Sequence, residues 1–462
     1  MDLTRLLVRA AAGRPRVLLL PMPGATDVRL AAERELRLQD FPSALTPAEA
    51  DVLLVAGPVP PALSAAVDRL WRDTPAPRAR ADAHTPSDVT AALSAARTRL
   101  AARPPRAAGR AGGDTVEPRD ADISGEGHRE PGERHEGGRE GNGHGHQGQG
   151  SGEQGGGQEG HSGRHEGHGG GHERHGGRRE GHGGRREGHG GRREGHGGMD
   201  LPAGLPMAEV GPDRDGLTLD RLHVPLGPLL ADWPAGLTVR LTLQGDVVQE
   251  ATVDGPVTPA PGTPPPAPFW TRPWQRAAAG EPVTAGEAAR RRAAARLDSL
   301  GRLLAVAGWP AQAVAARRLR DDLLDGLAEE ELPRRLGRFT RRVGRSRTLY
   351  WLTRGLGTLS AADAGAAGVS GPAARADGDV PARYRQWLAE VERDLARLGD
   401  PSPLEPGREE GPRGGPESSA ALVRLLPRLL DGAELAAARL IVASLDPDPD
   451  ELAVPVREVA GG

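Results

Sequence analysis

A tract that is almost free of large apolar side chains, residues 104–198, divides the chain into two segments that can fold. Glycine, histidine, arginine and glutamate dominate the tract. Such a sequence cannot bury enough surface to offset the entropy lost on ordering, so we expect it to be disordered. The whole chain has 66 Gly, 43 Pro and only 3% aromatic residues. Its hydrophobic core must therefore be concentrated in residues 1–103 and 199–457.

Twelve of the 14 histidines lie in this tract, which ends in repeats of His-Gly-Gly-Arg-Arg-Glu-Gly. Three glycines per repeat cost about 1 kcal/mol each relative to alanine, so the repeat cannot align its histidines on a helix. Neutral imidazoles bind Ni²⁺ and Zn²⁺, and a mobile chain can gather several of them. The alternative is a repeat-expanded linker whose metal affinity is incidental. The candidate metal ligands are His172, His175, His182, His189 and His196.

The chain contains no cysteine. This excludes disulfides, a nucleophilic thiol and any cysteine-ligated iron–sulfur cluster. Its 60 basic and 63 acidic residues give a net charge of −3, so no overall field favours nucleic acid or anionic lipid as a partner. Every basic residue is an arginine. With the heavy use of Ala, Gly and Pro, this indicates compositional bias and weakens arginine clusters as signals of phosphate recognition.

Apolar runs in the chain are short. The run at residues 17–20 is too short for a secretory signal core, and no run approaches the roughly 20 apolar residues of a transmembrane segment. We therefore expect a cytoplasmic protein. Peripheral attachment to the inner face of the membrane, through a complex, stays open.

Residues 1–103 have the pattern of a small α/β unit. Residues 16–20 and 51–56 are short apolar runs typical of buried parallel strands. A sheet of two strands is small and would need a partner surface. Helical composition is found at residues 25–38, 60–71 and 87–102.

Residues 50–59, Ala-Asp-Val-Leu-Leu-Val-Ala-Gly-Pro-Val, resemble a segment of the small iron–sulfur subunit shared by respiratory complex I and related hydrogenases. That family has a strand, then a glycine followed by cluster cysteines and a helix. Here the corresponding residues are Gly24-Ala25-Thr26-Asp27. The resemblance implies the N-terminal half of that subunit's fold without its cluster ligands. A generic nucleotide-binding or response-regulator-like α/β unit is the alternative.

Residues 199–255 predict a β-hairpin. Apolar and polar residues alternate from position 237 to 244, Gly245-Asp246 forms the turn, and a returning strand follows. A proline-rich connector, residues 256–280, comes next. The predicted fold class is an α/β N-terminal half-domain plus a mainly α C-terminal domain with an N-terminal β-hairpin, joined by a long disordered linker.

Residues 281–457 predict the helical domain. It opens with a capping box at Thr284 and Glu287. Apolar residues at three- and four-residue spacing then run from position 293 to 307, and Gly308 with Pro310 ends this helix. Similar apolar stripes predict further core helices up to the C-terminal segment.

Several motifs of the second segment follow the order found in the large subunit of the same family. The last of these motifs is Asp-Pro-Asp-Pro-Asp at residues 446–450, where the hydrogenase branch has Asp-Pro-Cys-x-x-Cys. Asp448 stands in the place of the first of those metal-binding cysteines. The earlier motifs are residues 224–228, 347–359, 368–372 with Arg375, and 378–384.

The resemblance implies an NADH-quinone oxidoreductase or hydrogenase scaffold, but the reactive groups are missing. In complex I the glycine–proline loop carries a histidine that faces the quinone. Here residues 229–231 are Leu-Leu-Ala, which cannot donate a proton. Asp448 and Asp450 offer hard oxygen ligands, which do not suit a redox nickel–iron centre. We therefore expect no catalytic residue, no stably bound cofactor and no catalysis by this chain alone.

The preferred hypothesis is a non-catalytic paralogue or accessory component of a respiratory or hydrogenase complex. Its two domains would dock on each other and on subunits of that complex. One alternative is a true oxidoreductase subunit that contributes His223 and Tyr384 to a quinone site. Another is a histidine-rich Ni or Zn delivery or storage protein. A Mg²⁺ site of Asp27, Asp448 and Asp450 is also considered, with helix-capping or surface roles as the alternative.

Overall fold

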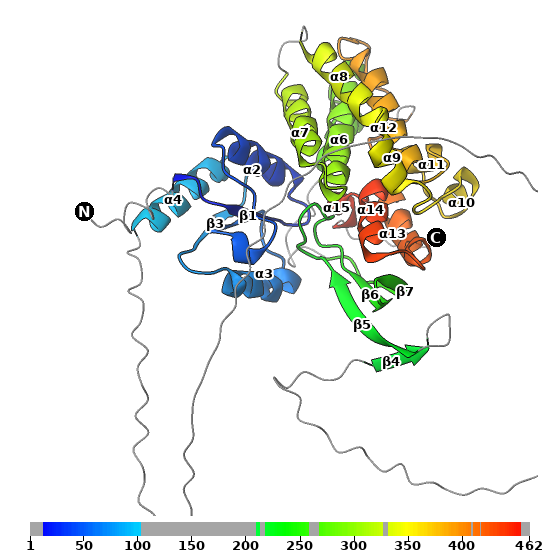
Figure 1. Ribbon diagram of the computed structural model, residues 1–462. Coiled ribbons are helices and arrows are strands. Elements are labelled where there is room, and N and C mark those ends of the chain that lie inside the picture. Colours follow the sequence, from blue (N-terminus) through cyan, green and yellow to red (C-terminus); the bar gives the residue numbers. More distant parts are fainter. Residues whose placement is uncertain are drawn as a thin grey trace, which may run out of the picture. The chain divides into compact units, whose positions relative to one another are not determined.

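A computed structural model describes residues 13–102, 209–212, 218–257, 268–326, 331–407, 410–415 and 417–453 (Figure 1). The tract predicted to be disordered lies outside the described residues, and the boundaries of the five predicted segments stay predictions. The described residues contain a parallel α/β part and a mainly helical part with an antiparallel sheet. This confirms the predicted fold class.

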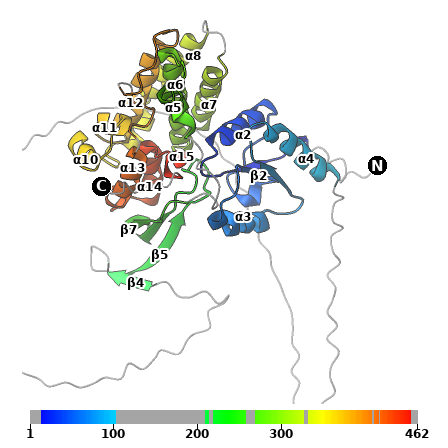
Figure 2. The same ribbon diagram turned by 180° about the vertical axis from the view of Figure 1, so that it is seen from behind.

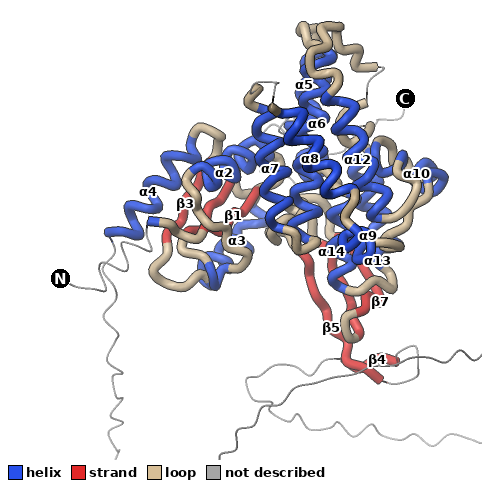
Figure 3. The backbone as a smooth tube through the Cα atoms, turned by 45° about the horizontal axis from the view of Figure 1, so that its top comes forward, coloured by secondary structure: helices blue, strands red, loops and turns tan. Residues whose placement is uncertain are grey.

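The α/β part is built on three parallel strands in the order β1 (Val17–Pro21), β2 (Val52–Ala56) and β3 (Ala79–Ala83). Every residue of β2, the middle strand, is buried, as expected for a continuous apolar run. Helices α2 and α4 pack against each other and against the sheet (Figure 3). The helices of this part are α2 (Thr26–Leu38), α3 (Pro61–Asp73) and α4 (Asp88–Ala102).

Strand β3 was not predicted from the sequence. It reads Ala-Arg-Ala-Asp-Ala and buries only its alanines, so it lacks the apolar run that marks the other two strands. It pairs with β2 alone and is an edge strand. Arg80 and Asp82 form an ion pair at 2.9 Å on its other face.

The antiparallel sheet has the order β4 (Glu209–Pro212), β5 (Thr218–Leu226), β6 (Val239–Gln244) and β7 (Val247–Val253). The predicted hairpin is confirmed, since β6 and β7 pair across a two-residue turn at Gly245 and Asp246. The apolar residues of β6 face the core. Strands β4 and β5, which the sequence did not indicate, extend this sheet beside β6.

Helix α6 (Ala285–Val306) is the centre of the helical part. Most of its residues are buried, including several charged ones. It lies between α7 and α12 in both views (Figures 1 and 2). Thr284 caps it, because its hydroxyl accepts a hydrogen bond from the Glu287 amide at 3.1 Å, as the capping motif predicts.

The other helical elements of this part follow α6 along the chain, except for η2 and α5, which precede it. No helix in the described ranges combines the length and apolar character that crossing a membrane requires. The elements are η2 (Phe269–Thr271), α5 (Arg272–Ala278), α7 (Pro310–Leu324), α8 (Leu332–Gly344), α9 (Arg347–Thr353), α10 (Ala361–Ala366), α11 (Pro372–Arg375), α12 (Val380–Leu395), α13 (Ser418–Leu430), α14 (Leu435–Leu445) and α15 (Pro449–Leu452).

Gly57, directly after β2, allows a close approach between the sheet and the start of α2. Its φ is +110°, and a Cβ there would lie 2.3 Å from the Ala25 Cβ and 3.1 Å from the Met22 Cβ. A side chain would therefore strain the backbone and also push on the loop that leads into α2.

We expect Gly57→Ala to lower the free energy of unfolding by about 3 kcal/mol, the sum of a left-handed backbone and an overpacked contact. The matched control is Gly245→Ala at the hairpin turn, where φ is +61° and nothing lies within 4 Å of the added Cβ. There only the backbone cost of about 1 kcal/mol remains. Urea unfolding followed by circular dichroism measures both, and equal losses would contradict the packing argument.

Candidate functional site

The two segments in which the family resemblance places metal ligands lie side by side. The Thr26 hydroxyl, at the first residue of α2, donates a buried 2.8 Å hydrogen bond to Oδ1 of Asp450 in α15. The described parts of the N-terminal and C-terminal segments belong to one compact unit. We call this junction, from α2 to the C-terminal residues 446–451, the joint.

The aspartates of the C-terminal signature stabilise the chain's own backbone at the joint. Asp448 is fully buried, and its Oδ1 accepts a hydrogen bond from the Asp450 amide at 3.0 Å, which caps α15. Oδ2 of Asp450 accepts another from the Phe269 amide at 3.1 Å. The capping role that the sequence left as an alternative for Asp448 is thus the one observed.

Asp27 does not join the two aspartates in a magnesium site. Its carboxylate forms an ion pair with Arg272 at 2.8 Å. Among the described residues, no group of three His, Asp or Glu side chains is arranged to hold a metal ion.

Arginines surround the carboxylate of Asp446, the residue that directly follows α14. It has a left-handed backbone, with φ of 54°, and accepts a hydrogen bond from the Ser299 hydroxyl at 2.5 Å. Arg302 forms an ion pair with one of its oxygens, and Arg413 lies 3.1 Å from the other. Arg413 also approaches Asp448, at 3.9 Å. Guanidinium groups therefore occupy the region where the resemblance would place metal-bound thiolates.

Asp298 of α6 connects this cluster to the α/β part. Its oxygens lie 2.8 Å from Arg29 of α2 and 2.7 Å from Arg320 of α7, and Arg302 is 3.6 Å away. Burial alone would raise the pKa of Asp298, but the charges of these three arginines outweigh it and hold the pKa well below its usual range. Asp298 therefore stays ionised in the core.

Helix α2 has further ion pairs with α7. Glu33 lies 2.7 Å from Arg320, and its neighbouring arginines lower its pKa to about 2 despite its burial. Arg34 and Arg37 pair with Asp325 and Asp321, each at 2.5 Å. Leu30, on the same helix, belongs to the hydrophobic core of the helical part. Helix α2 is thus attached by both charge and apolar packing.

Two acidic groups at the joint have raised pKa values. Burial, with the nearby charge of Asp448, raises the pKa of Asp450 to about 6 and that of Glu451 to about 8. The Ser419 hydroxyl donates a hydrogen bond to Glu451 at 2.5 Å. Glu451 therefore keeps its proton at neutral pH.

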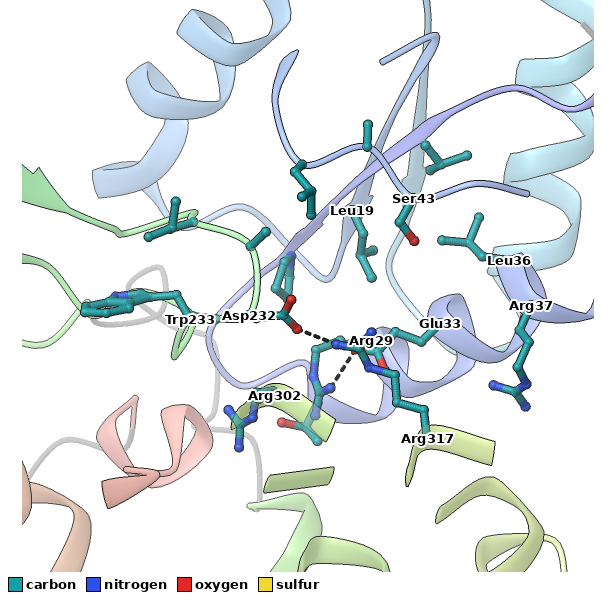
Figure 4. Close-up of a pocket in the computed structure, with 18 of the residues that line it drawn as sticks. Leu19, Arg29, Glu33, Leu36, Arg37, Ser43, Asp232, Trp233, Arg302 and Arg317 are labelled. Atoms are coloured by element: carbon teal, nitrogen blue, oxygen red, sulfur yellow. Dashed lines mark hydrogen bonds and ion pairs between the residues drawn. The ribbon is translucent and has the colours of Figure 1, made fainter. Parts of the chain in front are cut away.

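A cavity of about 370 Å³ lies next to the joint (Figure 4). Its apolar wall comes from β1, α2 and the loop after β5, and its charged side includes the Arg317–Asp232 ion pair. The buried Arg302 also lines it, and Nε of this arginine has no hydrogen-bond partner. The residues labelled in the figure are Leu19, Arg29, Glu33, Leu36, Arg37, Ser43, Asp232, Trp233, Arg302 and Arg317.

The polar groups that the sequence suggested for such a cavity do not line it. His223 is exposed on β5, with Nδ1 3.2 Å from the Thr242 hydroxyl. Tyr384 is buried in the helical core, and its hydroxyl has no partner. Neither residue is among those that line the cavity. The five histidines proposed as Ni or Zn ligands lie outside the described residues, and their metal binding stays a prediction.

Asp232 is the cavity residue that the sequence analysis missed. It follows directly after the Leu-Leu-Ala stretch of the glycine–proline loop, of which Leu230 and Ala231 also line the cavity. Burial raises the pKa of Asp232, although Arg317 opposes the shift. A carboxyl group of this kind can hold or release a proton. The sequence signal that could have identified Asp232 was its position, one residue after Ala231 in this loop.

The comparison with solved structures found distant structural likenesses. No protein-family model matches the chain, and no curated protein matches it. A chain from the "Structure of the membrane-bound sulfane sulfur reductase (MBS), an archaeal respiratory membrane complex" is similar, with 16% sequence identity and a TM-score of 0.37. The alignment covers 51% of this chain and 99% of that one. A TM-score of this size does not establish a common fold or a type of subunit.

We expect Asp298→Asn to lower the free energy of unfolding by about 3 kcal/mol or more, because it leaves buried guanidinium charges without their shared partner. The control is Asp254→Asn, which breaks the solvent-exposed 2.7 Å pair with Arg240 and should change stability little. Urea unfolding curves of both variants measure the difference. A similar small effect at the two sites would show that the buried network does not hold the joint together.

The raised pKa values at the joint predict a stability that falls as pH rises. The folded chain holds protons on Asp450 and Glu451 that the unfolded chain has released above pH about 4 to 5. Their contribution is complete at lower pH and is lost as pH passes about 6 and then 8. We expect Glu451→Gln to gain stability relative to the unaltered protein between pH 5 and 8, by at most about 1.4 kcal/mol per pH unit.

Urea unfolding at a series of pH values measures this gain. Glu250→Gln, at an exposed position on β7, is the control and should show no such trend. A difference between Glu451→Gln and the unaltered protein that stays constant from pH 5 to 8 would contradict the prediction.

Proposed function

We propose that the protein is a non-catalytic, subunit-like component of a respiratory or hydrogenase-type complex. One observation carries the proposal. At both segments where the resemblance places metal ligands, the side chains bind each other instead, and the Thr26–Asp450 hydrogen bond is their point of contact. The site of a redox centre would thus have become a structural joint.

The chemistry of the joint supports this view. A nickel–iron or iron–sulfur centre needs soft sulfur ligands, and the chain has no cysteine. A hard cation such as Mg²⁺ would meet the charges of Arg302 and Arg413, which already pair with Asp446. To bind there, the cation would have to displace buried arginines and leave their charges uncompensated, which is unfavourable.

The joint also gives a reason for the fusion of the two parts in one chain. Ion pairs between α2 and helices α6 and α7 hold the two parts together beside it. Polar interfaces of this kind are typical of parts that associate as separate chains. A covalent connection raises the effective concentration of one part for the other. The proposed partners are other subunits of the same complex.

A second candidate function is supported by the cavity. A quinone-like ligand could place its ring against the apolar wall, with Asp232 as the proton-holding group beside a carbonyl oxygen. In that case the chain would supply a binding pocket, and a partner subunit would supply the electrons. This is the oxidoreductase-subunit hypothesis with Asp232 in place of His223 and Tyr384.

We expect the tagged chain, purified from its native host, to bring down subunits of a respiratory or hydrogenase complex. By itself it should have no visible cofactor absorption and no quinone-reducing activity. Cross-linking with mass spectrometry identifies the partners, and spectroscopy with a soluble quinone tests the activity. Quinone reduction or a cofactor band in the isolated chain would overturn the first proposal. Quinone binding that is lost in Asp232→Asn, with no activity of the chain alone, would favour the second.

A further inference from the structure

Residues 332–354, which form α8 and α9, carry a strong local charge. These 23 residues contain eight arginines and no acidic residue, whereas the whole chain has a net charge of −3. Compositional bias explains the choice of arginine over lysine, but it does not explain the absence of acidic residues here. We call this segment the α8–α9 surface.

Helix α8 separates an apolar face from an arginine face. Its inner face buries Leu332, Leu336, Phe339 and Val343 in the helical core. The arginines on the other side follow at intervals of three and four residues, so they form one stripe about 16 Å long at 1.5 Å per residue. The exposed members of this stripe are Arg334, Arg338, Arg341, Arg342 and Arg345.

Among the described residues, most of these arginine charges have no acidic partner. Arg335, at the edge of the stripe, forms an ion pair with Asp322 at 2.7 Å. Within the part of the chain that the structure describes, none of the five exposed arginines has such a pair with a carboxylate. The stripe is therefore available to an anionic partner.

Helix α9 adds three consecutive exposed apolar side chains. It buries Leu349 and Thr353, while Tyr350, Trp351 and Leu352 are 40%, 65% and 50% exposed. They belong to the small set of large apolar side chains that the described residues leave exposed. The Arg385 guanidinium of α12 lies 4.8 Å from the centre of the Tyr350 ring.

We propose that the α8–α9 surface binds anionic phospholipid headgroups, with Trp351 and Leu352 inserted among them. Arginines attract the negative surface potential of such a membrane, and tryptophan is enriched at the boundary between headgroups and acyl chains. The stripe and the apolar residues follow one another directly in the chain. Together they supply the two signals that reversible attachment to a membrane requires.

Two other anionic partners fit this surface less well. The apolar side chains are flanked by Arg347, Arg354 and Arg385, so they do not form the continuous apolar centre of a protein interface. Insertion into headgroups needs no such centre. Nucleic acid would use tryptophan and arginine, but an aliphatic side chain such as Leu352 offers no ring on which a base can stack.

The test uses the full chain and vesicles of phosphatidylcholine with or without phosphatidylglycerol. We expect sedimentation with the anionic vesicles and none with phosphatidylcholine alone. The triple variant Arg338→Gln, Arg341→Gln and Arg345→Gln should bind at least about 100-fold more weakly, since each charge near the surface contributes about five-fold. The control removes the same charge from exposed positions elsewhere, with Arg69→Gln, Arg97→Gln and Arg424→Gln, and should bind normally.

Brominated lipids test the insertion of Trp351 separately. They should quench part of the fluorescence of the seven tryptophans, and Trp351→Phe should remove that part while leaving the binding nearly unchanged. An equal loss of binding in the arginine variant and its control would overturn the proposal, as would equal binding to neutral vesicles. The proposal would also be overturned if the protein bound no vesicles but bound DNA, and if the same arginine variant lost the DNA binding.

Discussion

The carboxylate of Asp298, shared by arginines from three helices, is the interaction on which the rest of the structure depends. It brings Arg29 of α2 and Arg320 of α7 to the middle of α6. Neither the carboxylate nor these guanidinium groups could be buried alone, because an uncompensated charge in the core is strongly unfavourable. Docking of the α/β part therefore completes the charge balance of the helical part. Through Arg302 the same network reaches Asp446 and the C-terminal segment.

The segments in which the resemblance would place cysteine ligands take part in this network. A nickel–iron or iron–sulfur centre needs soft thiolate ligands. In this chain the corresponding residues are a hydroxyl, helix-capping aspartates and arginines that neutralise them. Hydrogen bonds and ion pairs among these groups fix the geometry of the junction. Polar atoms without a hydrogen-bond partner remain at this junction on Arg302, Arg413 and Asp448, and Arg302 also lines the adjacent cavity.

The turn and the helix cap that depend on a few neighbouring residues were predicted correctly from the sequence. The hairpin turn at Gly245 and the cap at Thr284 follow from turn and capping rules, and both are observed. Strand β3 escaped prediction because its alanines become buried only when β2 lies beside them. His223 and Tyr384 were chosen by residue type, but one faces solvent and the other is enclosed in the core. Asp232 was passed over because its environment comes from segments far away in the sequence.

The sequence by itself determined the composition of each part, the absence of thiolate chemistry, the helical and strand periodicities and the charge of residues 332–354. These properties depend on residue type and spacing alone. Only the tertiary structure decided that Thr26 meets Asp450 and that Asp298 is shared by arginines of three helices. It also decided that, among the described residues, the five exposed arginines of the α8–α9 surface named above have no ion pair with a carboxylate. The physical reason is that desolvation and charge pairing depend on distances between residues hundreds of positions apart, and periodicity carries no information about them.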